Sequence, residues 1–253
     1  MINIIKKIRV TVVAILWILI FAILLTSCNS SHKRDKLNGA LDNIVADFNN
    51  FINPPYGDIE FSLFKNGDLI FQIDSSSFSN AVIESTSGNF SHVGIIERIA
   101  DILYIIDATP KKGVSKQLLV DFITQTPKDS LGIPMIRVKR LNKLQENVSA
   151  DSLQAIANNA VEHALSLLGK PYDFAFTKGD EKIYCSELIY ESFRCNGAPI
   201  FSLIPMNFKD STGEISDFWI DYYQKLNLPV PQGEEGSNPN QIYQSPLLRE
   251  IAF

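Results

Sequence analysis

The sequence is poor in cysteine and histidine and has no excess of positive charge. It contains three of each of these residues in a chain of 253, and 23 lysines and arginines stand against 28 aspartates and glutamates. Proteins that bind nucleic acid usually carry a basic surface, so this balance argues against nucleic acid as a partner. The length and the 45% hydrophobic content suffice for one sizeable core, so a single domain is the default expectation.

The one long apolar run lies at the amino terminus. Basic residues precede an apolar run from Val10 to Leu25, which is the layout of an export signal. The run ends in Leu-Thr-Ser-Cys at residues 25–28, which resembles a lipobox, so we expect residues 1–27 to be a lipoprotein signal peptide and Cys28 to carry the lipid. A transmembrane anchor is the alternative, although about 16 apolar residues fall just below the usual spanning length.

Both interpretations place the domain outside the cytoplasm, held to a membrane in the periplasm or at the cell surface. Without residues 1–27 the chain keeps 20 basic and 28 acidic residues, which makes it more acidic still. Residues 28–57 would hold the lipidated cysteine, a short polar tether and an amphipathic helix. The apolar residues from Leu37 to Phe51 recur at helical spacing before Pro54-Pro55 stops the helix. We therefore expect the globular domain at residues 58–253.

The rest of the sequence predicts an α+β domain. Period-two patterns favour strands at 67–73, 91–97, 102–107 and 133–141. Helical spacing predicts helices at 149–168, capped by Ser149 and ended by Gly169, and at 185–194, with a short helix and a loop in the serine-rich stretch before Gly88. After Gly197 the chain is expected to be mostly irregular, with an aromatic cluster at 218–223.

Cys185 lies where the second predicted helix begins. Free N–H groups and the helix dipole at that position favour the nucleophilic thiolate, and the same N–H groups could hold an oxyanion. A buried cysteine with no chemistry is the plain alternative, and we assign that role to Cys195. If Cys28 is lipidated, these two cysteines remain, and a continuous helix would hold them about 15 Å apart, beyond disulfide reach.

His92 is the best candidate for the base that a cysteine nucleophile needs. His32 falls in the polar tether, and His163 lies at the edge of the apolar stripe of the predicted 149–168 helix. His92 lies in a strand beside Gly94. If residues 98–101 form a four-residue hairpin loop, Ile96 pairs with Leu103 and His92 pairs with Asp107, which makes Asp107 the acid that orients the imidazole. The weaker substitutes are Glu84, Glu97 and Asp101.

Together these residues resemble the circularly permuted branch of the NlpC-type papain-like cysteine peptidases, the amidases of the YaeF/YiiX type. The resemblance covers about residues 58–253, and its matching segments are Gly67-Asp68-Leu69-Ile70-Phe71, Ser91-His92-Val93-Gly94, Asp107-Ala108, Gly169-Lys170-Pro171-Tyr172-Asp173 and Tyr184-Cys185-Ser186-Glu187. Their order is the specific feature, because the histidine precedes the cysteine here and follows it in papain. The resemblance implies an antiparallel sheet packed against helices, including the nucleophile helix.

The resemblance also implies a triad of Cys185, His92 and Asp107, with Tyr184 and Ser186 at the oxyanion position or in the pocket. The family usually has glutamate where this chain has Asp107, so the shorter side chain moves the hydrogen-bond acceptor by about one methylene, roughly 1.3–1.5 Å. The expected reaction is hydrolysis of an amide or isopeptide bond through a thioester, with cell-wall peptides as substrate or N-acyl lipids as the alternative. No metal or organic cofactor is implied. A peptide- or lipid-binding module without catalysis, and a structural lipoprotein, are the competing functions.

Overall fold

The computed structural model describes residues 59–144, 148–179 and 181–253. The chain divides into two units, Met1–Gly57 and Asp58–Phe253, and the described residues belong to the second. The expected signal peptide, the lipidated Cys28 and the helix at 37–51 therefore lie outside the described residues. Within the described part of the chain, no helix has the length and apolar character needed to cross a membrane.

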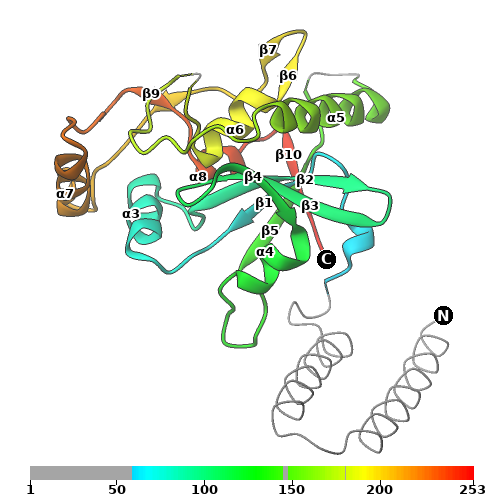
Figure 1. The fold of residues 1–253 in the computed structure, drawn as a ribbon, viewed down its shortest axis with the longest axis horizontal. Coiled ribbons are helices and arrows are strands. Elements are labelled where there is room, and N and C mark those ends of the chain that lie inside the picture. The colour runs from blue at the N-terminus through cyan, green and yellow to red at the C-terminus, as the bar shows by residue number, and fades with distance from the viewer. Residues whose placement is uncertain (1–58, 145–147, 180) are drawn as a thin grey trace, which may run out of the picture. The chain divides into compact units, whose positions relative to one another are not determined.

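The domain is built on one six-stranded antiparallel sheet (Figure 1). Across the sheet the strands are β10 (Leu248–Ile251), β5 (Ile136–Leu141), β1 (Leu69–Gln72), β2 (His92–Ile99), β3 (Ile102–Thr109) and β4 (Gly113–Leu118). Two small two-stranded sheets pair β6 (Arg194–Cys195) with β7 (Ala198–Pro199), and β8 (Ile204–Pro205) with β9 (Glu235–Gly236). The predicted α+β class with an antiparallel sheet is confirmed.

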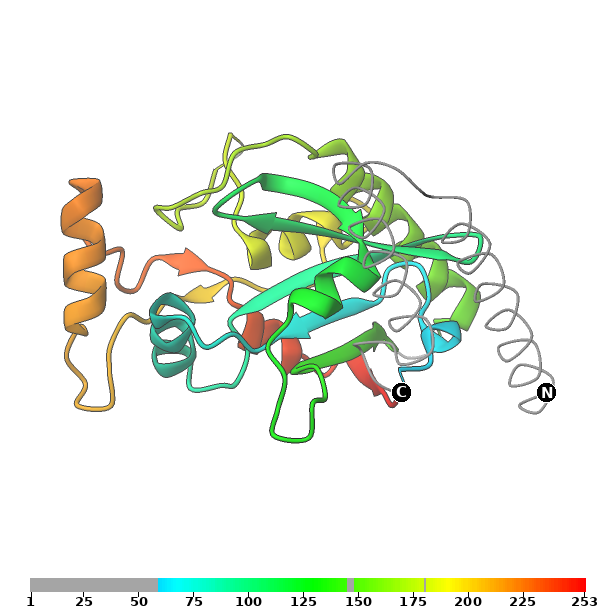
Figure 2. The same ribbon diagram turned by 60° about the horizontal axis from the view of Figure 1, so that its bottom comes forward.

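Helices cover both faces of this sheet (Figures 1 and 2). Side chains alternate along β2, so Val93 and Ile95 join the main core with α5 (Ala150–Ser166) and α6 (Cys185–Ser192). His92, Gly94 and Ile96 face the other side, where α4 (Leu119–Gln125) packs on β3 and β4. The remaining helical elements are η1 (Phe61–Leu63), α3 (Ser77–Thr86), α7 (Asp217–Leu226) and α8 (Pro239–Tyr243).

The β2–β3 hairpin differs from the register predicted from the sequence. Its turn contains two residues, Ala100 and Asp101, and not four, so Ile96 pairs with Ile105 and not with Leu103. Ala100 adopts a left-handed φ of 51°, the conformation that tight two-residue hairpin turns require. The predicted pairing was therefore wrong by two residues. A slip of two keeps every side chain on its own face, so Asp107 still shares a face with His92 but lies across from Gly94.

The segment after Gly197 is more regular than predicted, because it contains α7, α8 and β10. The aromatic residues of α7 pack together, with Trp219 and Tyr222 also against Phe78 of α3. Aromatic residues have modest helix propensity, so α7 depends on this packing more than on its own sequence preference. Ser149 caps α5 as predicted by accepting a hydrogen bond from the Ser152 N–H. Both α5 and α6 end two residues earlier than predicted.

Candidate active site

His92 and Asp107 form a hydrogen-bonded pair on the face of the sheet that carries α4. Nε2 of His92 lies 2.9 Å from Oδ2 of Asp107, and the Asp107 side chain is 1% exposed. Gly94 separates the two in the register, and a Cβ added there would lie 2.6 Å from Cδ1 of Ile105. Glycine at this position therefore leaves room for the Ile105 side chain. No described residue donates a hydrogen bond to Oδ1 of Asp107.

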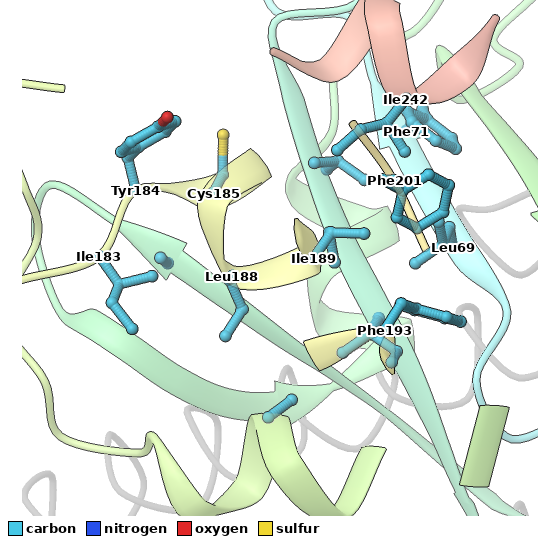
Figure 3. Packing of buried hydrophobic residues seen from close by; sticks show 14 of the residues in the cluster. Leu69, Phe71, Ile183, Tyr184, Cys185, Leu188, Ile189, Phe193, Phe201 and Ile242 are labelled. Carbon is cyan, nitrogen blue, oxygen red and sulfur yellow. The ribbon is translucent and has the colours of Figure 1, made fainter. Parts of the chain in front are cut away.

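Cys185 is the first residue of α6 and is 6% exposed. Figure 3 shows its side chain and that of Tyr184 pointing away from the buried Leu188. The sulfur lines the same cavity as the two sheet residues, and Cys185 hydrogen-bonds with His92 at the start of β2. Cys185, His92 and Asp107 all line a polar cleft of about 470 Å³. The structure thus brings together the three residues of the predicted triad.

The electrostatics of His92 favour its protonated form. Burial lowers the pKa of His92, but hydrogen bonding with Asp107 and Cys185, together with attraction to their negative charges, outweighs burial and raises it to about 10. The imidazole is therefore an imidazolium at neutral pH. A positive charge beside the sulfur, at the amino end of a helix, stabilises the thiolate form of a cysteine.

Glu187 lies in the first turn of α6 and keeps the helix start in place without adding charge. Its carboxyl oxygens accept hydrogen bonds from the Tyr184 and Gly179 N–H groups at 3.4 Å each. Burial raises the pKa of Glu187 to about 8, against the effect of these two hydrogen bonds. At neutral pH the side chain is therefore mostly neutral, and it places no full negative charge next to the Cys185 sulfur.

Tyr184 and Ser186, the two predicted pocket residues, both bind Ser237. The Tyr184 hydroxyl accepts a hydrogen bond from the Ser237 N–H at 3.1 Å, and the Ser186 hydroxyl donates to the Ser237 carbonyl oxygen at 3.0 Å. Burial raises the pKa of Tyr184 to about 12, so its phenol keeps its proton. Tyr184 can still donate that proton to an oxyanion, whereas the Ser186 hydroxyl already donates its own.

Asn240 in α8 is a positioning residue that sequence analysis missed. Its Oδ1 accepts hydrogen bonds from the Asn89 and Phe90 N–H groups, and its Nδ2 donates to the Phe90 carbonyl oxygen at 2.8 Å. These bonds fix the backbone just before His92. Ser237 and Asn240 together tie the start of α6 to the start of β2.

Two cavities meet at Cys185. The polar cleft contains His92, and a smaller cavity of about 60 Å³ contains Tyr184, Ser186 and Ser237. Ser91 and Tyr172 contribute to the lining of both. Tyr172, from the predicted Gly-Lys-Pro-Tyr-Asp motif, is 6% exposed and is a wall residue that the sequence did not assign.

The other candidates lie elsewhere. Glu97 pairs with Lys116 at 2.5 Å, while Glu84 and Asp101 are exposed. Cys195 lies in β6 as a half-buried free thiol, and Cys185 is free as well. Within the ranges that the structure describes, no group of three or more histidine, cysteine, aspartate or glutamate side chains is placed to hold a metal ion.

Comparison with known proteins identifies the family of this fold. The model of the permuted papain-like amidase enzymes, YaeF/YiiX, C92 family, matches residues 64–252. The uncharacterized protein YiiX of Escherichia coli strain K12 is 30% identical over 188 residues, which cover 74% of this chain and 86% of YiiX.

A crystal structure described as metalloprotein YiiX from Escherichia coli O157:H7 shares the fold with a TM-score of 0.59. It is 24% identical in sequence, and the match covers 74% of this chain and 96% of that one. The family model spans most of the described residues, and the identity to YiiX of strain K12 extends over most of both chains. This chain therefore belongs to the permuted papain-like amidase family of the YaeF/YiiX type.

Proposed function

We propose that the protein is a cysteine amidase or peptidase with Cys185 as nucleophile, His92 as general acid and base, and Asp107 as the residue that orients His92. The observation that supports this most is the position of His92. Its ring is hydrogen-bonded to a buried carboxylate and shares a cleft with a cysteine at a helix start. Membership of a family of papain-like amidases supports the same reaction class.

The reaction follows from these positions. The Cys185 thiolate attacks the amide carbonyl carbon, and a C–S bond forms while the carbonyl oxygen becomes an oxyanion. The first-turn N–H groups of α6 have no acceptor within the helix, and with the Tyr184 hydroxyl they can stabilise that charge. The His92 imidazolium gives its proton to the amine nitrogen as the C–N bond breaks. His92 then takes a proton from water, which attacks the thioester, releases the acid and restores the thiolate.

The description as a metalloprotein applies to the related Escherichia coli protein. The described residues of this chain offer no ligand group for a metal ion, so none of the proposed steps is assigned to a metal. The expected setting is the cell envelope, with the chain held to a membrane through lipid on Cys28. In that setting, the amide bonds of cell-wall peptides are the proposed substrates.

Digestion of cell-wall muropeptides by the purified full-length protein, followed by mass spectrometry of the products, tests the proposal. We expect new amine and acid ends at one bond, and their loss in Cys185→Ala and Cys185→Ser, with circular dichroism unchanged. Cys195→Ala is the matched control and should keep activity. Cleavage that persists in either Cys185 variant would remove the proposed nucleophile, and a protein that binds muropeptides without turnover would be a binding module on this fold.

A further inference from the structure

The two cavities that meet at Cys185 differ in character, and the mechanism assigns one part of the substrate to each. His92 must protonate the leaving nitrogen, so the amine part of the substrate lies in the cleft that contains His92. The carbonyl carbon lies at the sulfur. The acyl part therefore extends from the sulfur into the second cavity, whose lining does not include His92.

The acyl-side cavity is apolar. Its lining is dominated by the side chains of Phe78, Val82, Phe176, Met206, Phe208 and Trp219. Two of its polar groups already bind each other, because the Trp219 indole N–H donates to the Ser85 hydroxyl at 2.8 Å. A charged acyl group would lose its hydration there and find no described side chain of opposite charge in the lining, which makes its burial unfavourable.

The acyl-side cavity is also small. Its volume is about 60 Å³, whereas an apolar cavity of about 150 Å³ is of the size that holds a benzene molecule. A short or branched alkyl group fits such a space, and a long acyl chain does not. This size favours the compact side chain of a peptide over the fatty acyl chain of an N-acyl lipid.

The amine-side cleft has the opposite character. Of the described residues that line it, none is a lysine or an arginine, while Asp74 and Asp107 are both present. Asp107 is paired with His92, whereas Asp74 lies beside the histidine strand, with its N–H bonded to the Ser91 hydroxyl at 3.3 Å. Burial opposes the charge of Asp74, but hydrogen bonds from serine residues keep its pKa below the usual value, so it is ionised. The His92 imidazolium is compensated by Asp107, so Asp74 leaves the cleft with an excess of negative charge, and a carboxylate on the leaving amine would be repelled.

We infer that the substrate is an amide with a compact apolar group on its acyl side and a polar, non-anionic group on its amine side. This inference rests on the proposed function, because it uses Cys185 and His92 to orient the substrate. Among amides, the inference favours a peptide with a small apolar residue on the acyl side and disfavours a lipid with a long acyl chain.

Acylation of Cys185 by a series of p-nitrophenyl esters tests the acyl side in the detergent-solubilised full-length protein. Acetate, butyrate, isovalerate, octanoate and succinate are compared by the p-nitrophenolate burst and by the intact mass of the acyl-enzyme, with Cys185→Ala as the background. We expect butyrate and isovalerate to acylate about tenfold faster than acetate, octanoate and succinate, since one or two methylenes in a fitted apolar pocket change rates by about this factor or more.

Two substitutions in the cavity should move this preference in opposite directions. Val82→Phe fills the cavity and should shift the optimum toward acetate, whereas Met206→Ala enlarges it and should shift the optimum toward octanoate. Ile83→Phe is the matched control, because Ile83 is the next residue on α3 and is not part of the lining. Equal acylation of Cys185 by every ester would refute the inference but leave the proposed nucleophile intact. An optimum that neither substitution moves would do the same. No acylation by any ester would instead refute the proposed function.

The amine side is tested by the reverse step, in which an amine attacks the butyryl-enzyme, a C–N bond forms, the amine gives a proton to His92, and the C–S bond breaks to release the thiolate. Glycylglycinamide and glycylglycine differ by one carboxylate, and we expect the amide to react at least about fivefold faster. Asp74→Asn should reduce that ratio, and Asp101→Asn, in the exposed β2–β3 turn, should not. Equal rates for the two amines in the unmodified protein would overturn the amine-side assignment.

Discussion

Asp107 reaches His92 across the β2–β3 hairpin, although the two are not directly opposite each other: the register, continued one pair beyond Ile95 and Ile106, puts Asp107 opposite Gly94. The 2.9 Å contact between Nε2 and Oδ2 leaves Oδ1 buried, with no partner among the described residues. One carboxylate oxygen thus holds the ring. This geometry makes the orientation of His92 sensitive to the charge and the length of the side chain at position 107.

Asp107→Asn should therefore lower kcat by about 10²-fold or more, because the amide keeps the shape but loses the charge that stabilises the imidazolium. Asp107→Glu should keep part of the activity. Glutamate is the family's usual residue, although its carboxylate lies about one methylene, roughly 1.3–1.5 Å, further out. Steady-state kinetics on a cleaved muropeptide measures both, and full activity in Asp107→Asn would show that the carboxylate does not act.

The His92 ring should titrate near pH 10, which NMR of the imidazole protons can follow. Asp107→Asn and Cys185→Ala should each lower this pKa, because burial still opposes the charge while one partner is lost. The folded value lies above the usual 6.5, so the stabilisation from His92 is complete below pH 6.5 and disappears as the pH rises through about 10. His163 is the internal control, since burial and nearby Arg194 lower its pKa. A His92 titration near 6.5 would contradict the ion pair.

Iodoacetamide at neutral pH should label Cys185 at least about tenfold faster than Cys195, even though Cys185 is the more buried thiol. The reason is that the thiolate is the reactive form of a cysteine, and the His92 imidazolium is hydrogen-bonded with Cys185. His92→Ala should slow labelling of Cys185 and leave Cys195 unchanged, as peptide mass spectrometry can show. Equal and slow labelling of the two cysteines would rule out an activated nucleophile.

Glu187→Gln should make stability less dependent on pH. The pKa of Glu187 is about 8 in the folded chain and near 4.5 when exposed, so between these values the unfolded chain releases a proton that the folded chain keeps. The free energy of unfolding of the native protein should therefore fall as pH rises through this range, by up to about 1.4 kcal/mol per pH unit.

Urea unfolding of the two proteins at a series of pH values measures this difference. Glutamine at position 187 keeps an acceptor for the Tyr184 N–H but has no group that titrates. The free energy of unfolding of Glu187→Gln should therefore change less with pH than that of the native protein. Parallel curves would show that Glu187 is ionised in the folded protein.

The sequence by itself determined the fold class, four of the six strands of the main sheet, the capped α5 helix, and the identity of Cys185 and His92 as a candidate pair. These follow from period-two and helical spacing, from local capping and from the residue types that thiol chemistry needs, all of which are properties of nearby residues. The shared face of His92 and Asp107 was also predictable, because a register error of two residues does not change the face.

Only the tertiary structure decided the register itself, the helical form of α7, the positioning role of Asn240 and the two cavities at Cys185. Asn240 acts on a backbone about 150 residues earlier in the chain, and no local pattern encodes a hydrogen bond over that separation. The cavities have walls from α3, α4, α6 and distant loops. Their polarity and size arise when these segments pack, because the shape of a space depends on all the surfaces that enclose it.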